Sequence, residues 1–136
     1  MAMLLHLSFR VMDPARSAAL YAELLDGRGV DIGPPLDSIG VKGVYFGRNG
    51  EDELCDQIEL WPAGKHWGPG GFRDLDARAL PFGHLAVESD KPWEELVRIA
   101  ERHGVPASRE PRGLPYLVPV VYDLDGNFSE LFPPRR

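Results

Sequence analysis

The sequence predicts an α+β fold built from two βαβββ modules, and three observations support this. A strand–helix–three-strand pattern occurs twice, and each copy begins with a histidine-bearing strand and ends with a glutamate-bearing one. A segment rich in glycine and proline separates the copies. Such self-similarity indicates a duplicated supersecondary unit. We place module one at about residues 1–62, the linker at about 63–82 and module two at about 83–136, within a single domain.

One module alone would expose the concave face of its small sheet. We therefore expect the modules to pair, within one chain or across a dimer, and to form a curved mixed sheet around a concave site. The 136 residues are 43% hydrophobic and 26% charged, which is ordinary for one globular domain.

The composition also excludes several classes of partner. A net charge of -6 argues against nucleic-acid binding, because phosphate recognition needs a clustered basic surface. No apolar run approaches the length of a membrane span, and the first residues lack the basic lead and cleavage site of a secretion signal. Cys55 is the only cysteine, so no internal disulfide can form. These features predict a cytoplasmic protein with no membrane partner.

The first strand and helix are the clearest elements of module one. Residues 4–11 alternate between an apolar face and a mixed one, as a half-buried strand does. The apolar face holds Leu5, Leu7, Phe9 and Val11, and the other holds Leu4, His6, Ser8 and Arg10. Asp13 and Pro14 then form an N-cap and first turn, and an alanine-rich helix follows until Gly27.

The rest of module one is predicted as a poor strand or loop and then two strands. These are residues 30–40, 41–46 and 55–61, with a turn at 48–50 between the two strands. The linker that follows carries many glycines and prolines. We interpret it as a connecting segment that also covers part of the molecule.

Module two repeats the order. Its elements are a strand at 84–89, a helix opened by 90–92 and ended by Gly104, and strands at 105–110, 116–123 and 128–132. The buried face of this helix is predicted to hold Trp93, Leu96, Val97 and Ala100. Pro119 indicates an edge or a bulge, because proline cannot donate to a strand ladder. The turn at 125–127 lacks the acidic positions of a calcium loop and is interpreted as a hairpin.

Four residues recur in equivalent places in the two modules: His6 and Glu59, then His84 and Glu130. A single strand histidine is usually structural, but the repetition of both residue types on consistent faces favours a shared site. If the modules pair about a pseudo-twofold axis, all four side chains point into one concavity. Two imidazoles and two carboxylates suit Zn, Ni, Co, Mn or Fe(II).

These motifs resemble the vicinal-oxygen-chelate superfamily, which includes glyoxalase I, bleomycin-resistance proteins, fosfomycin-resistance enzymes, methylmalonyl-CoA epimerase and type I extradiol dioxygenases. The resemblance covers essentially the whole chain. It is carried by HLSFRV at 6–11, GHLAV at 83–87 and DLDGNFSELF at 123–132.

The order His, Glu, His, Glu looks most like bacterial glyoxalase I. By that resemblance His6, Glu59, His84 and Glu130 would hold Ni²⁺, Co²⁺ or Zn²⁺, with Fe or Mn also compatible, and the protein would be a homodimer acting on a small molecule. The implied reaction is proton transfer next to a chelated carbonyl, as in a lyase or isomerase, with Glu130 as base and Glu59 as its symmetric partner.

The same resemblance implies residues that bind the substrate. Arg10 lies where glyoxalase I has an arginine for a glutathione carboxylate. Two positions depart from that enzyme: Trp61-Pro62-Ala63 replaces a stretch with an asparagine, and Leu80 replaces a basic residue. These departures argue against glutathione as cosubstrate. Trp61, Trp67 and Phe132 instead suggest an aromatic pocket for a flat or apolar substrate.

Two other functions are open at this point. One is a metal-free small-molecule or antibiotic-binding protein similar to the bleomycin-resistance proteins. The other is an extradiol dioxygenase, which the fourth carboxylate disfavours, because oxygen and a catecholate need vacant metal positions.

Overall fold

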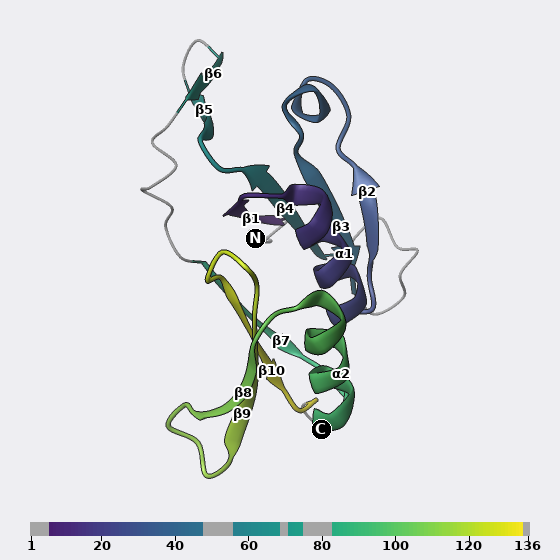
Figure 1. Ribbon diagram of the computed structural model, residues 1–136, viewed down its shortest axis with the longest axis vertical. Helices are drawn as coiled ribbons and strands as arrows, with labels where there is room; N and C mark the ends of the chain where they lie inside the picture. Colours follow the sequence, from purple (N-terminus) through teal and green to yellow (C-terminus); the bar gives the residue numbers. More distant parts are fainter. Residues whose placement is uncertain (1–5, 48–55, 69–70, 75–82, 135–136) are drawn as a thin grey trace, which may run out of the picture. The chain divides into compact units, whose positions relative to one another are not determined.

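The computed structural model describes residues 6–47, 56–68, 71–74 and 83–134. The chain divides into two compact units, Met1–Pro81 and Phe82–Arg136 (Figure 1). Unit 1 contains β1 (His6–Val11), α1 (Pro14–Leu24), β2 (Arg28–Asp31), the 3₁₀ helix η1 (Leu36–Ile39), β3 (Lys42–Phe46), β4 (Asp56–Pro62), β5 (Lys65–Gly68) and β6 (Gly71–Asp74). Unit 2 contains β7 (His84–Glu88), α2 (Trp93–His103), β8 (Ala107–Pro111), β9 (Leu117–Tyr122) and β10 (Phe128–Phe132).

The predicted α+β duplication is confirmed by the topology of the two sheets. The strand order is β1-β4-β3-β2 in unit 1 and β7-β10-β9-β8 in unit 2. β1 runs parallel to β4, and β7 runs parallel to β10 in the same way. All other neighbouring strands in the two sheets are antiparallel. Each module therefore forms its own four-stranded mixed sheet with one helix packed on it.

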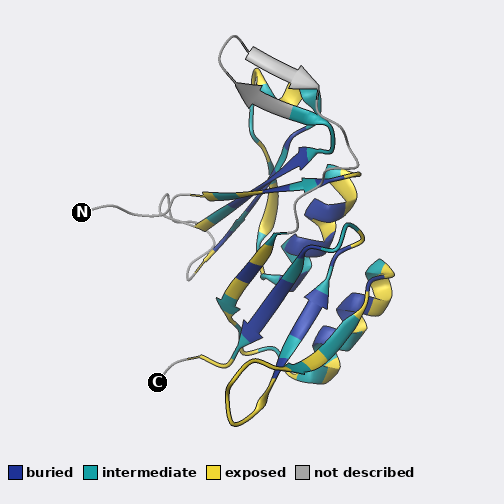
Figure 2. Cartoon of the chain, turned by 90° about the vertical axis from the view of Figure 1, so that its left-hand side faces the viewer, coloured by how far each residue is buried: buried dark blue, intermediate teal, exposed yellow. Residues whose placement is uncertain are grey.

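In unit 1, α1 packs on β2, β3 and β4. The predicted alternation of β1 is confirmed, since Phe9 and Val11 are buried whereas His6 and Ser8 are exposed (Figure 2). The Asp13 side chain accepts a hydrogen bond from the Arg16 backbone N–H at 3.1 Å, which is the expected N-cap.

The C-terminal end of α1 differs from the prediction. The helix ends at Leu24, and the residue with a left-handed backbone is Asp26, at a φ of 51°, rather than Gly27. Asp tolerates this region better than most residues. Gly27 is required for another reason: a Cβ there would overlap the carbonyl oxygen of Tyr45 on β3.

The segment read as a linker contains regular structure. β5 and β6 pair in antiparallel register to form a separate two-stranded sheet, with His66 opposite Arg73. The sequence pattern did not predict this hairpin for two reasons. Its strands are only four residues long each, and the glycines at 68, 70 and 71 are more typical of a loop. Residues 69–70 and 75–82 of the predicted linker, and the predicted turn at 48–50, lie outside the described residues.

In unit 2, α2 buries Leu96, Ile99 and Ala100 and ends at Gly104, whose φ of 65° is left-handed. Ile99 is a core residue that the predicted face omitted, whereas Trp93 and Val97, which that face included, are half-buried. Pro119 lies on β9, which is flanked by β8 and β10, but the pairing of β9 with β10 runs only from Tyr122 to Val120. Pro119 therefore falls where the missing N–H interrupts no part of that ladder.

The turn before β10 is a tight hairpin, as predicted. The Asp123 carboxylate accepts from the backbone N–H groups of Asp125 and Asn127 at 2.8 and 3.0 Å. The Asn127 amide donates to the same carboxylate at 2.9 Å and accepts from the Gly83 N–H at 2.8 Å. These bonds join the β9–β10 turn to the start of β7, the strand that carries His84.

Ser129 on β10 gives a stability prediction. Its side chain is 0% exposed, and its hydroxyl has no hydrogen-bond partner within the part of the chain that the structure describes. An unsatisfied buried hydroxyl costs free energy, so we expect Ser129→Ala to raise the free energy of unfolding by about 1 kcal/mol. Urea unfolding followed by circular dichroism measures this. A loss of stability would show that the hydroxyl has a partner after all.

Candidate metal centre

The first histidine–glutamate pair lies within unit 1. Because β1 and β4 are parallel, with His6 opposite Gln57 and Ser8 opposite Glu59, the two side chains share a face of the sheet. His6 Nε2 lies 3.2 Å from Glu59 Oε1. The imidazole is 48% exposed and the carboxylate 9% exposed, so a half-exposed histidine lies beside a buried glutamate.

Trp61 and Arg10 extend this pair. Trp61 is two residues after Glu59 on the same strand face, and its indole N–H donates to Glu59 Oε2 at 3.3 Å. The Arg10 guanidinium lies over the Trp61 ring, 5.0 Å from its centroid. Burial lowers the pKa of Arg10 from its ordinary value. The shared face predicted for these residues is confirmed, and their part in substrate binding stays a prediction.

The second pair lies within unit 2 and is built in the same way. β7 and β10 are parallel, with His84 opposite Phe128 and Ala86 opposite Glu130. His84 Nε2 lies 3.8 Å from Glu130 Oε1, with the imidazole 58% exposed and the carboxylate 11% exposed. The imidazole stacks on the Phe128 ring at a centroid distance of 5.0 Å and an interplanar angle of 8°.

Arg112 is a site residue that sequence reasoning missed. It follows β8, and its Nε donates to Glu130 Oε2 at 2.7 Å. Its Nη2 donates to Glu110 Oε2 at 2.9 Å. Eighteen residues separate Arg112 from Glu130, and only the packing of β8, β9 and β10 brings them together. The repeat gave no signal, because its first copy has no matching arginine bound to Glu59 among the described residues.

Glu110 also binds Tyr122, which gives a pH prediction. The Tyr122 hydroxyl donates to both Glu110 oxygens at 2.9 and 3.0 Å, and this hydrogen bond raises the pKa of Tyr122 above its ordinary value. The neutral phenol is the bonded form, so its stabilising contribution is present below the ordinary tyrosine pKa of about 10 and is lost as pH rises through the higher folded value.

Ultraviolet titration of the parent against Tyr122→Phe isolates the ionisation of this one tyrosine. We expect its midpoint to fall in Glu110→Gln, which removes the carboxylate acceptor but keeps a similar shape. A Tyr122 midpoint at or below the ordinary value in the parent would contradict the hydrogen bond.

The structure thus brings together His6 with Glu59 and His84 with Glu130, as two pairs in two units. Within the described ranges no three His, Cys, Asp or Glu side chains gather as a metal-binding cluster. The union of both pairs into one four-ligand site stays a prediction. Phe132, predicted to contact substrate, is half-buried on β10 two residues after Glu130. Cys55, Leu80 and the Trp67 side chain lie outside the described residues.

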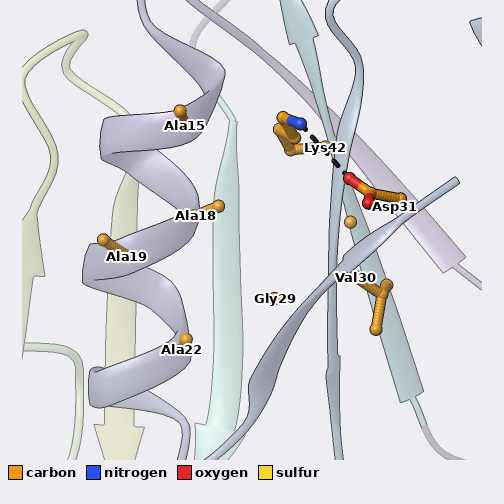
Figure 3. A pocket seen from close by; sticks show the side chains of 9 residues that line it. Ala15, Ala18, Ala19, Ala22, Gly29, Val30, Asp31 and Lys42 are labelled. Carbon is orange, nitrogen blue, oxygen red and sulfur yellow. Dashed lines mark hydrogen bonds and ion pairs between the residues drawn. The ribbon is translucent and has the colours of Figure 1, made fainter. Parts of the chain in front are cut away.

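A cavity of about 330 Å³ in unit 1 lies away from Glu59. It is open between α1 and β2–β3, and the Lys42–Asp31 ion pair of 3.3 Å lies beside it (Figure 3). In the β3–β4 register Lys42 is opposite Leu60, whereas Glu59 is opposite Gly43. Because neighbouring strand residues point to opposite faces, Lys42 and Glu59 lie on different sides of the sheet. The cavity therefore belongs to the helix side.

Neither the models of protein families nor the curated protein sequences give a significant match to this chain. Solved structures do. A glyoxalase I from Leishmania major, described as trypanothione-dependent, is 23% identical with a TM-score of 0.54, and the match covers 98% of this chain and 87% of that one. The fosfomycin resistance protein FosX from Mesorhizobium loti is 17% identical with a TM-score of 0.58, over 99% and 94% of the two chains.

An integron cassette protein from the mobile metagenome of V. cholerae is 21% identical with a TM-score of 0.61, over 96% and 94% of the chains. All three are members of the vicinal-oxygen-chelate superfamily or share its architecture. This chain has the vicinal-oxygen-chelate fold. The fold expected from the motifs at 6–11, 83–87 and 123–132 is therefore confirmed across essentially the whole chain. In the described part of the chain, no helix has the length and apolar character needed to cross a membrane.

Proposed function

We propose that this protein is a metal-dependent lyase or isomerase that moves a proton next to a carbonyl of a small molecule. The observation that carries the proposal is the duplicated pair: in each unit a half-exposed imidazole nitrogen faces a buried carboxylate oxygen across two parallel strands. The likeness in fold to a glyoxalase I and to the fosfomycin resistance protein FosX supports chemistry on a small molecule.

The residues present fit a divalent metal. Imidazole nitrogen and carboxylate oxygen are ligands of Zn, Ni and Co, and they bind at about 2.0–2.2 Å, so two neighbouring ligands of a tetrahedral ion lie about 3.4 Å apart. The nitrogen–oxygen separations of 3.2 Å and 3.8 Å bracket that value. We propose that His6, Glu59, His84 and Glu130 hold one Ni, Co or Zn ion, and the same ligands are compatible with Fe or Mn.

When bound, such a metal supplies Lewis-acid polarisation of the carbonyl oxygens of the substrate. The chain supplies the rest. In this proposal Glu59 and Glu130 are the candidate bases, and one of them accepts a carbon-bound proton of the substrate and returns it to the neighbouring carbon. Both carboxylates are largely shielded from solvent. Trp61 is only 8% exposed and supports Glu59 from the protein side, half-buried Phe132 offers apolar surface to the substrate, and Arg10 offers a cation for an anionic group.

Elemental analysis of protein prepared without a metal-affinity tag tests the proposal. We expect a divalent metal at stoichiometric level, together with turnover of methylglyoxal, with or without glutathione, that is lost in Glu130→Gln. Metal retained in both proteins without any turnover would mean that the substrate is a different small carbonyl compound. If the parent protein binds no metal, even after incubation with Ni²⁺, Co²⁺ or Zn²⁺, the proposal is wrong. Size-exclusion chromatography of the same samples tests the proposed homodimer.

The second candidate is a metal-free small-molecule-binding protein, and Arg112 is the observation that favours it. Its guanidinium already neutralises Glu130, as a cation would in a protein that has lost its metal. This function predicts that affinity for an apolar antibiotic is unchanged by chelator and by His84→Ala. A metal-dependent enzyme predicts that both treatments abolish activity.

A further inference from the structure

We propose that Arg112 is a positioning residue for Glu130: it occupies Oε2, so that Oε1 alone is presented to a metal beside His84. This inference rests on the proposed function, because it concerns the same four ligands. Neither the repeat nor the fold of the neighbours assigns a role to this arginine.

The first support is the contact itself. Arg112 Nε donates to Glu130 Oε2 at 2.7 Å, and His84 Nε2 lies 3.8 Å from Oε1, so the two oxygens have different partners. A charge-assisted bond of this length is roughly twice as strong as a neutral one. The carboxylate is 11% exposed, so little water competes for Oε2.

The second support is that Arg112 is itself held in place. Its Nη2 donates to Glu110 at 2.9 Å, and Glu110 also accepts from the Tyr122 hydroxyl. Its guanidinium lies 5.7 Å from the centroid of Phe128, the ring on which His84 stacks. Arg112 and His84 therefore share one aromatic neighbour, and Glu110 holds the guanidinium through a second nitrogen, Nη2.

The third support is the contrast with unit 1. Glu59 Oε2 accepts from the neutral indole of Trp61 at 3.3 Å, a longer and weaker bond than the one from Arg112 to Glu130. The two glutamates occupy equivalent places in the repeat but have unequal anchors. Through its Oε2 atom, Glu130 therefore has the stronger anchor of the two.

The consequence is a difference in metal affinity. Groups that hydrogen-bond a ligand orient it, and their removal costs about 10–100-fold in metal affinity. We expect Arg112→Gln to weaken Ni²⁺ binding by that factor, measured by isothermal titration of the full chain. Arg112→Lys keeps the charge but lacks the planar fork, so an intermediate affinity is expected. Arg109→Gln is the matched control, because Arg109 lies on β8, just before Arg112 in the chain, but its guanidinium lies over Trp93 on α2, 5.2 Å from that ring.

Affinity in Arg112→Gln that equals the parent's overturns the inference, and so does tighter binding, which would make Arg112 a competitor of the metal. If Arg112→Gln does not fold by circular dichroism, Arg112→Lys decides: weaker binding than the parent supports positioning, and equal binding overturns it. Glu130→Gln separates the two proposals. Affinity lost in Glu130→Gln but kept in the arginine variants refutes only the positioning role, whereas affinity kept in Glu130→Gln refutes the metal site.

Discussion

His6→Ala and His84→Ala are each expected to weaken Ni²⁺ binding by about 100-fold. Four-ligand protein sites for zinc bind with about 10–16 kcal/mol, so one ligand contributes about 3 kcal/mol, and every 1.4 kcal/mol is tenfold in affinity. Isothermal titration of tag-free protein measures both affinity and stoichiometry. His103→Ala is the matched control, because His103 lies in the last turn of α2, where a cation is favoured by the helix dipole.

The stoichiometry in this experiment decides how the pairs act. If His6, Glu59, His84 and Glu130 hold one ion together, each histidine variant weakens the single binding event by a similar factor. If each unit binds separately, the parent binds two ions weakly, and each variant loses one of them while the other keeps its affinity. Two independent weak sites would contradict the single four-ligand centre, even though metal binding itself persisted.

Much of this fold could be predicted because it depends on patterns among residues that are close together in the sequence. The Asp13 cap, the alternation of β1 and the turn around Asp125 depend on neighbouring residues, so each was predictable. The repeat added the long-range information that His6 and Glu59 occupy places equivalent to those of His84 and Glu130. Each histidine lies beside the glutamate of its own unit because β1 pairs in parallel with β4 and β7 with β10, whereas the union of the four residues in one site stays a prediction.

What escaped prediction depends on contacts between segments that no local pattern links. Arg112 reaches Glu130 only across the sheet formed by β8, β9 and β10, and its exposed position after β8 resembles an ordinary loop arginine. Ile99 was omitted from the buried face of α2 because the side of the helix that packs on β8 and β9 is turned toward Ile99, which leaves Trp93 and Val97 half-buried. The sequence pattern assigns Gly27 to the end of the helix, but the constraint on this residue comes from the Tyr45 carbonyl oxygen on β3, which is far away in the sequence.

Gly27→Ala is therefore expected to lower the free energy of unfolding by about 3 kcal/mol, the upper part of the range for overpacked positions. The new Cβ would overlap the Tyr45 carbonyl oxygen and approach the Phe46 Cβ at 3.1 Å. Backbone atoms paired in a sheet cannot move aside as a flexible side chain can, so α1 or β3 must shift. Urea unfolding gives the measurement.

Gly29→Ala is the matched control, because a Cβ two residues further along meets no heavy atom within 4 Å. It removes conformational freedom from the unfolded chain, so a change of at most about 1 kcal/mol is expected. Equal effects of the two substitutions would show that the approach of residue 27 to β3 is not a tight constraint. β3 also pairs with β4, where Gly43 is opposite Glu59. A shift of β3 would therefore reach the strand that holds the first carboxylate, and Ni²⁺ affinity should fall in Gly27→Ala but not in Gly29→Ala.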